Sequence, residues 1–273
     1  MKIIVFNGGL GNQMFEYAYY RYLQELYPNE NFYAYIPKEA HIVHNGLEIS
    51  TWFDVALPPT SILVNIIASA LIFIDKIVRK FHLPIHVVSC DRYVSKEKML
   101  HIGNFQDRTF CDKSFLKFRN YSDLGNENAK LLQKMQNVNS VAVHVRRGDY
   151  LISAIHKQYA GLCTPSYYKK AIAEINKSIE NPVFFFFSDD KKYVEETFDV
   201  PNKVIVTCNK GKRSFFDMYL MAHCKNMIVA NSTFSWWAAY LNTRAEKIYC
   251  PIRWNNIKPY PNLILEGWHV VEP

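Results

Sequence analysis

The sequence predicts an α/β protein built from two doubly wound domains that face one another across a cleft. Residues 1–36 read as strand, glycine loop, helix and strand, which is the beginning of a βαβ unit. After residue 138, short apolar strands alternate with amphipathic helices, as in a parallel sheet covered on both faces. A chain of 273 residues has room for two such domains, and we place them at 1–138 and 139–273.

The first domain opens with the apolar run "KIIVF" (2–6), a buried strand that ends at Asn7-Gly8. The stretch "GGLGNQMFEYA" (8–18) then carries a glycine loop into a helix, expected from Asn12 to Tyr27 with Asn12 as the N-cap. Such a loop is either a tight turn or a place where a ligand approaches the main chain. Pro28 ends the helix, and "NFYAYI" resumes as a strand.

The middle of the chain is less regular. Residues 60–80 are expected to form an amphipathic helix with basic residues at its end, which either packs on the first domain or lies on a membrane surface; we favour packing. Residues 85–90 and 101–106 resemble strands, and 123–137 a helix that precedes the second domain.

The second domain is expected to contain five parallel strands with helices between them. The expected strands are 140–146, 182–188, 203–207, 226–230 and 247–251. The expected helices are 166–180, 191–198, 213–224 and 232–241.

Composition excludes several classes of protein. The net charge of +7 suits a polyanionic ligand or an acidic membrane surface, but no basic block occurs, so we expect no nucleic-acid partner. The six cysteines have neither disulfide-framework nor zinc-site spacing. The N-terminus lacks the form of a signal peptide, and the longest apolar run, 62–74, is too short to cross a bilayer. We expect a cytoplasmic protein, with possible peripheral contact at the inner face of the membrane.

The first strand end with chemical interest is "VAVHVRRGDY" (141–150). Strand alternation puts His144 and Arg146 on one face and Arg147 on the other. Gly148 permits a sharp turn, and Asp149 can pair with an arginine or orient the histidine. Arginine grips phosphate with a planar, permanently charged fork, so we favour a phosphate site over an exposed basic turn.

Two further strand ends carry polar residues. In "FFFFSDD" (184–190) the carboxylates either bind a nucleobase or ribose or cap the following helix. Asn231, Ser232 and Thr233 precede a helix whose N-terminus suits a phosphate, although a simple N-cap explains a serine or threonine equally well. Asp217 either stabilises the first turn of its helix or bonds a guanine or ribose edge.

The sequence contains no Asp-x-Asp or Glu-x-Asp triplet, no metal-spaced His/Cys set and no phosphate-binding Gly-x4-Gly-Lys loop. If a diphosphate leaves during a reaction, arginine and a helix dipole must therefore stabilise it without Mg²⁺. We expect no metal ion and no other cofactor.

The chain resembles the bacterial α-1,2-fucosyltransferases of glycosyltransferase family 11 over nearly its whole length. Four stretches carry the resemblance by their order and spacing: "GGLGNQMFEYA", "HVRRGDY" (144–150), "FSDD" (187–190) and "NSTFSWWAAYL" (231–241). Some members carry Gly-Tyr-Trp-Gln where this chain has "GNFQ" (103–106), which concerns the acceptor side. The resemblance implies an inverting, metal-independent enzyme of the GT-B fold, with two Rossmann-like domains. It implies transfer of L-fucose from GDP-β-L-fucose, as substrate rather than cofactor, to the 2-hydroxyl of a terminal galactose, on an oligosaccharide or a lipid-linked glycan.

The resemblance also implies roles for individual residues. The first domain takes the acceptor and the second binds the GDP-sugar. Arg146 holds the β-phosphate, Asp149 fixes its loop, His144 touches the guanosine and Asp217 reads guanine. The residues implied to surround the donor phosphates are Asn231, Ser232, Thr233 and Phe234. The residues implied to lie near the fucose or the acceptor are Gly11, Asn12 and Gln13, and Asn12 is expected to be one of the catalytic residues. Glu16 is a candidate base, or else a solvated helix carboxylate.

Alternative functions remain open from sequence. One is a GT-B transferase that uses another nucleotide sugar. The other is a non-catalytic protein that binds a nucleotide or carbohydrate on the same scaffold.

Overall fold

The computed structural model describes residues 1–273 except 42–43, 121–123, 152 and 258–260, and it does not describe the side chains of 149, 153–155 and 261. The chain divides into two compact units, Met1–Asn120 and Tyr121–Pro273. The division lies before the expected boundary at 138/139, because helix α4 (Asn126–Asn137) packs on the second unit. Its Asn128 donates from Nδ2 to Asn209 Oδ1 at 3.0 Å.

The first unit contains a parallel sheet of order β2-β1-β3. Its strands and α-helices are β1 (Lys2–Val5), α1 (Leu10–Leu26), β2 (Phe32–Tyr35), α2 (Ile49–Trp52), α3 (Ile62–Lys80) and β3 (Leu100–His101). The expected βαβ beginning is confirmed. Ile3 and Val5 point to one face of the sheet and form a core with Val64 and Ala68 of α3, whereas α1 packs against β1 with its own buried side chains.

Two details of the first unit differ from expectation. Helix α1 begins at Leu10 with Gly9 as its N-cap, because the carbonyl of Gly9 accepts from the backbone N–H groups of Asn12 and Gln13. The expected strand at 85–90 does not form; only isolated bridges join Ser89 to His101 and Cys90 to Tyr93. Strand β3 is correspondingly short, so local apolar character overstated the strand content of this region.

The second unit contains a parallel sheet of order β6-β5-β4-β7-β8-β9. Its strands are β4 (Asn139–Val145), β5 (Pro182–Ser188), β6 (Lys203–Ile205), β7 (Asn226–Ile228), β8 (Lys247–Pro251) and β9 (His269–Val271). Its α-helices besides α4 are α5 (Ser153–Tyr159), α6 (Pro165–Ser178), α7 (Lys191–Thr197), α8 (Phe215–Met221) and α9 (Thr233–Leu241). Numbered within the unit, the order is 3-2-1-4-5-6, as in dinucleotide-binding folds.

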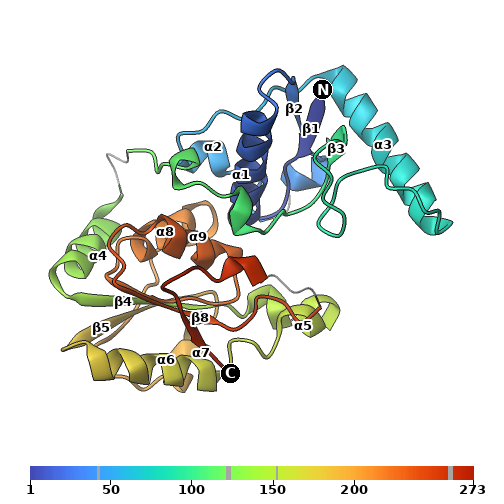
Figure 1. Ribbon diagram of the computed structural model, residues 1–273. Coiled ribbons are helices and arrows are strands. Elements are labelled where there is room, and N and C mark those ends of the chain that lie inside the picture. Colours follow the sequence, from blue (N-terminus) through green and yellow to red (C-terminus); the bar gives the residue numbers. More distant parts are fainter. Residues whose placement is uncertain (42–43, 121–123, 152, 258–260) are drawn as a thin grey trace. The chain divides into compact units, whose positions relative to one another are not determined.

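Helices cover both faces of this sheet, as expected for a doubly wound fold. Figure 1 shows α6 and α7 on one side and α4, α8 and α9 on the other. Val141 and Val143 of β4 lie in the core with α6 and α7. By alternation, Ala142 and His144 therefore face α4, α8 and α9. The sixth strand, β9, was not predicted, because it is only three residues long.

Candidate functional site

The second unit has its topological switch point between β4 and β7. These strands are neighbours, with Val143 opposite Ile228, but the chain leaves β4 toward β5 and leaves β7 toward β8. Connections that diverge in this way leave a crevice at the carboxyl ends of the two strands, which is where parallel α/β sheets bind ligands. The segments that follow β4 and β7 are the ones singled out by sequence.

Arg146 and Arg147 follow β4 and have different partners, as strand alternation predicted. Arg146 Nη1 lies 2.8 Å from Asp189 Oδ2. Arg147 instead bonds Asp190 Oδ2 from Nε at 3.0 Å and places its guanidinium 3.6 Å from the ring centroid of Tyr193. The two adjacent arginines are therefore held by different carboxylates.

Asp189 organises the turn after β4. Its Oδ1 accepts from the backbone N–H of Arg147 at 2.9 Å while Oδ2 binds Arg146. A Cβ at position 148 would lie 2.6 Å from Oδ2, so the carboxylate fits against this turn because residue 148 is glycine. Asp190 is the N-cap of α7 and accepts from Tyr193 N. The sequence left two roles open for Asp189 and Asp190, binding of a nucleobase or ribose and capping of the following helix, and Asp190 is the residue that caps it. The arginine-holding role of Asp189 was not predicted, although its place at the end of β5 was the available signal.

His144 is buried beside the start of α9. Its ring centroid lies 5.9 Å from that of Phe234, and its side chain is 7% exposed. Burial, and then the positive charge of Arg146, lower the pKa of His144 to about 4, so the ring is neutral near pH 7. Nδ1 has no hydrogen-bond partner in the described structure. Asp149 lies in the turn Gly148–Leu151, and its side chain, with the contacts to Arg146 or His144 expected of it, lies outside the described part of the chain.

The segment after β7 joins the turn after β4. The hydroxyl of Tyr150 donates to the carbonyl of Asn231 at 2.9 Å. Ser232 is the N-cap of α9 and accepts from Phe234 N at 3.3 Å, so the simple capping role is present. Thr233 and Phe234, in the first turn of α9, are partly exposed. The structure thus brings the turn that holds Arg146 next to a helix N-terminus.

Asn231 differs from the prediction of a donor-binding side chain. It is 3% exposed, and its Nδ2 donates to the carbonyls of Tyr159 and Trp254 at 3.0 and 3.4 Å. Both amide hydrogens are therefore used within the fold. The Asn231 side chain therefore holds two neighbouring segments of the fold together. The start of helix α9, which follows Asn231, is the part of this segment that a ligand could bind.

Asp217 lies in the first turn of α8 and does not belong to the segments that follow β4 and β7. Its Oδ1 accepts from Asn209 Nδ2 at 2.8 Å, and Asn209 in turn bonds Asn128 of α4. Burial raises the pKa of Asp217 to about 7, against the lowering effects of Asn209 and Lys191. A carboxyl that titrates near neutrality can accept hydrogen bonds when ionised, and perturbed groups of this kind often mark functional sites.

In the first unit, Gln13 anchors a loop rather than presenting its amide. Nε2 donates to the carbonyls of Gly8 and Gly46, both at 2.8 Å. Oε1 accepts from Glu48 N at 2.9 Å and Ile49 N at 3.1 Å. Two donors and two acceptor sites are the full capacity of a glutamine side chain. Gln13 therefore has no group left for an acceptor, contrary to the expectation.

Asn12 remains partly exposed at the start of α1. Its Oδ1 accepts from Gln106 Nε2 at 3.1 Å, which ties the "GNFQ" loop to the glycine loop. Gly8 has φ of 73° and a Cβ there would lie 3.1 Å from Asn12 Nδ2, so this position requires glycine for both backbone and space. Gly11 is buried within the helix.

Glu16 differs from one of its two expected descriptions. The side chain is fully buried, so it is not a solvated helix carboxylate. Oε2 accepts from Asn7 N at 3.0 Å, and Oε1 has no partner in the described structure. Desolvation, with a smaller effect of Asp91, raises the pKa of Glu16 well above its usual value. Its carboxyl holds the residue that precedes the glycine loop.

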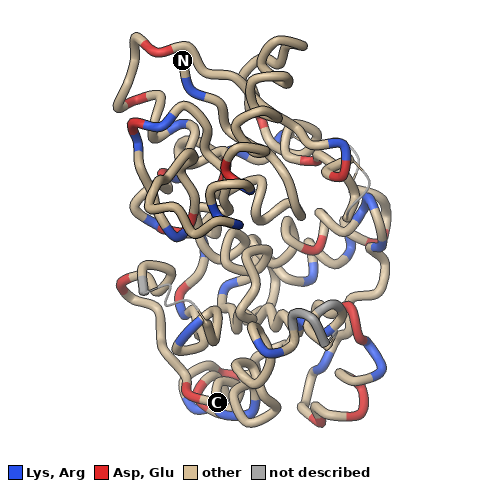
Figure 2. The backbone as a smooth tube through the Cα atoms, turned by 90° about the vertical axis from the view of Figure 1, so that its right-hand side faces the viewer, with Lys and Arg blue, Asp and Glu red and all other residues tan. Residues whose placement is uncertain are grey.

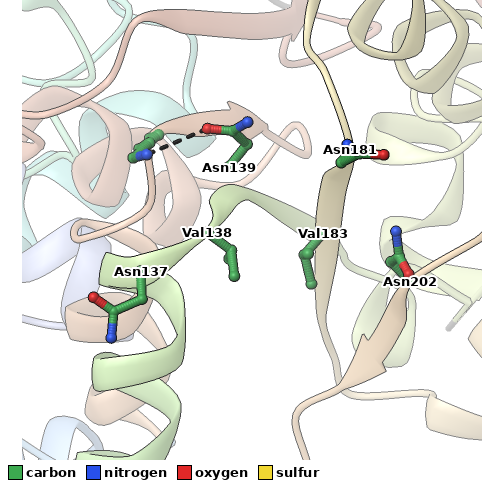
Figure 3. A pocket seen from close by; sticks show the side chains of 7 residues that line it. Asn137, Val138, Asn139, Asn181, Val183 and Asn202 are labelled. Carbon is green, nitrogen blue, oxygen red and sulfur yellow. Dashed lines mark hydrogen bonds between the residues drawn. The ribbon is translucent and has the colours of Figure 1, made fainter.

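A surface pocket of the second unit lies at the opposite end of the sheet. Figure 3 shows Asn137, Val138, Asn139, Asn181, Val183 and Asn202 around it, at the amino ends of β4, β5 and β6. Its asparagines serve the fold: Asn181 and Asn202 have positive φ, and Asn139 bonds the carbonyl of Glu180 and accepts from Lys225 Nζ. We assign no function to this pocket.

Charge and metal-ligating residues are distributed without an obvious focus. Figure 2 shows Lys and Arg interspersed with Asp and Glu along both units, rather than in one basic stripe of the kind typical of nucleic-acid binding. Among the described residues there is no group of three or more His, Cys, Asp or Glu that could hold a metal ion. Within the same part of the chain, no helix combines the length and apolar character needed to cross a membrane.

The fold and the family match together define the class of protein. The structure matches that of NodZ, an α-1,6-fucosyltransferase soaked with GDP-fucose, with a TM-score of 0.51 and 15% sequence identity over 90% of this chain and 92% of that one. This likeness concerns the fold, which is that of the GT-B glycosyltransferases. The family model of glycosyl transferase family 11 matches residues 1–259, and the chain belongs to that family.

Curated relatives agree with this assignment. The chain is 32% identical to an α-1,2-colitosyltransferase of Escherichia coli over 259 residues, 88% of each protein. It is 39% identical to the O-antigen biosynthesis glycosyltransferase WbnK of Escherichia coli over 135 residues, 49% of this chain and 45% of that protein. It is 31% identical to galactoside α-(1,2)-fucosyltransferase 1 of Saimiri sciureus over 103 residues, 37% and 28% of the two chains. The last two alignments thus span less than half of those relatives. The chain is a glycosyltransferase of this family, and the sugars it uses are a separate question.

Proposed function

We propose that this glycosyltransferase moves L-fucose from GDP-β-L-fucose to the 2-hydroxyl of a terminal galactose, with inversion at the transferred carbon. The names of relatives support the α-1,2 linkage, and one of them specifies a galactoside acceptor. The observation that carries the proposal is the pairing of the Arg146 turn with the start of α9 at the switch point.

In the proposed reaction, the galactose 2-hydroxyl oxygen attacks C1 of fucose from the face opposite the nucleotide, and its proton is released to solvent water, so that GDP and H⁺ leave as the products. The bond from C1 to the phosphate oxygen breaks, and GDP leaves with the additional negative charge. The guanidinium of Arg146 and the positive end of the α9 helix dipole supply positive potential where that charge develops. We assign no metal ion to this role.

Asp189 is proposed as the positioning residue for Arg146. A guanidinium has five N–H donors, so its contact with Asp189 through Nη1 is compatible with a phosphate bound by its other donors. The neutral ring of His144 stands beside the same helix start and adds no charge to the site. Asp217 is proposed to accept from the guanine edge, and its ionised form is the stronger acceptor.

A second donor is favoured by one relative, the α-1,2-colitosyltransferase. Colitose is L-fucose without its 3-hydroxyl. An enzyme built to bond that hydroxyl discriminates strongly against the sugar that lacks it, whereas a pocket without such a bond accepts both.

The test compares GDP-fucose, GDP-colitose, GDP-mannose and UDP-galactose as donors, with lactose as acceptor, in the presence and absence of EDTA. GDP release reports turnover, and NMR of the product reports the linkage and anomeric configuration. We expect an α-1,2-linked fucoside and no effect of EDTA. Preference for GDP-colitose would replace the donor assignment. Binding of GDP without turnover of any donor would contradict the proposed activity. Inhibition by EDTA would contradict the proposal that the reaction needs no metal ion.

A further inference from the structure

Helix α3 exposes an unusually apolar face. Six large apolar side chains of this helix are between 38% and 82% exposed. We call them the α3 apolar face: Ile62, Leu63, Ile66, Phe73, Ile74 and Ile77. Contiguous exposed apolar surface of this kind usually marks an interaction site rather than free surface.

These side chains form one continuous arc. At about 100° per residue, the six positions fall within about 120° around the helix axis. The arc is separate from the side of α3 that packs on the sheet, where Val64 and Ala68 are buried and Leu71 is partly buried. The helix therefore has one side that packs into the core and a second apolar side whose large side chains are exposed. Figure 1 shows the C-terminal half of α3 extending beyond the short strands of the first unit.

The apolar surface continues past the end of the helix. Phe81, Leu83 and Ile85 follow α3 and are 66%, 47% and 58% exposed. Large exposed apolar side chains therefore occur also in the chain that leads from α3 toward β3.

The charges on α3 are mainly positive. Lys76 and Lys80 are exposed and lie at one border of the apolar arc. The helix has a single acidic residue, Asp75, which is paired with Arg79 at 2.6 Å. No uncompensated carboxylate thus borders the apolar face, and the lysine stems are long enough to lie along apolar surface while their charges reach outward.

We propose that the α3 apolar face binds a membrane surface rich in anionic lipid, with the helix lying parallel to the bilayer plane. An apolar arc bordered by lysines is the arrangement that enters the headgroup boundary while its cations bind acidic lipids. Parallel pairing with a second copy through the same face would instead bring Lys76 and Lys80 close to their equivalents, which like-charge repulsion opposes. This inference is independent of the donor and acceptor assigned above.

The experiment is co-sedimentation of the full chain with phosphatidylcholine vesicles, with and without phosphatidylglycerol. We expect binding to the vesicles that contain phosphatidylglycerol, and weaker binding at about 1 M salt, where the Debye length is about 3 Å. The double variant Lys76→Gln/Lys80→Gln should bind about 25-fold more weakly, since each lysine contributes about fivefold. The double variant Ile66→Asp/Phe73→Asp should bind about 100-fold more weakly or not at all.

The matched control is Ile257→Asp, which changes an isoleucine that is 67% exposed in the second unit and should leave vesicle binding unchanged. Because all the changed side chains are exposed, circular dichroism and Tm should match those of the unchanged protein. Equal binding by the unchanged protein and Ile66→Asp/Phe73→Asp would overturn the proposal, and so would absence of binding to either kind of vesicle. A dimer in analytical ultracentrifugation that this variant converts to monomer, without vesicle binding, would assign the face to self-association instead.

Discussion

Replacing Arg146 with alanine tests the charge that we assign to the departing nucleotide. The side chain is 30% exposed and paired with Asp189 at 2.8 Å, so it stands at the boundary between protein and solvent. At an effective dielectric constant of about 20, two unit charges about 4 Å apart interact by about 4 kcal/mol. Loss of that interaction in the transition state lowers kcat/KM by about a thousandfold.

The adjacent arginine provides the control. The Arg147→Ala variant also removes one positive charge. That charge lies elsewhere, because the guanidinium of Arg147 contacts Asp190 and Tyr193. We expect this variant to change kcat/KM by less than about tenfold. Asp189→Asn keeps Arg146 but removes the carboxylate that orients it, and kcat should fall about tenfold with a smaller change in KM for the donor.

The assay is donor turnover measured as GDP release with lactose, accompanied by unfolding in urea. A partly exposed ion pair contributes about 1 kcal/mol or less to stability, so the Arg146 variant should remain folded under assay conditions. Activity of Arg146→Ala within tenfold of the unchanged protein would refute the assignment. An equal loss in Arg147→Ala would also refute it, because the effect would then reflect net charge and not position.

Three further predictions concern groups that the structure places in new roles. Gln13→Ala removes four hydrogen bonds and should lower the free energy of unfolding by about 3 kcal/mol in urea, whereas no loss would show that the loop is held by other contacts. Burial raises the folded-state pKa of Asp217 to about 7, so its protonation stabilises the fold at low pH, and that contribution is lost as the pH rises from about 4 through 7. Relative to the unchanged protein, the Asp217→Asn variant should therefore gain up to about 4 kcal/mol of unfolding free energy between pH 4 and pH 8. A difference between the two proteins that does not change with pH would contradict this. Glu16→Gln should retain the hydrogen bond from Asn7 N through its amide oxygen, and with it the stability of the fold; marked destabilisation of this variant in urea would show that the carboxylate has a role that an amide cannot replace.

Much of the fold follows from local patterns in the sequence. Alternation of side chains along a strand requires no knowledge of partners, and it correctly separated Arg146 from Arg147. The periodicity of apolar residues located α1 and α3, and the capping residues located the turns before α7 and α9. These features depend on neighbours within a few residues, so the sequence alone determined them.

Other features depended on tertiary structure, because they join residues far apart in the chain. Strand order and register brought Asp189 to Arg146, across 43 positions, and loop packing turned Gln13 into an anchor for Glu48 and Ile49. The burial of Glu16 could not be read from its helical position, since it is covered by segments that meet only after folding. A sequence specifies which side of an element is apolar, but the packing of distant elements decides which polar groups are used within the fold and which are left for a ligand.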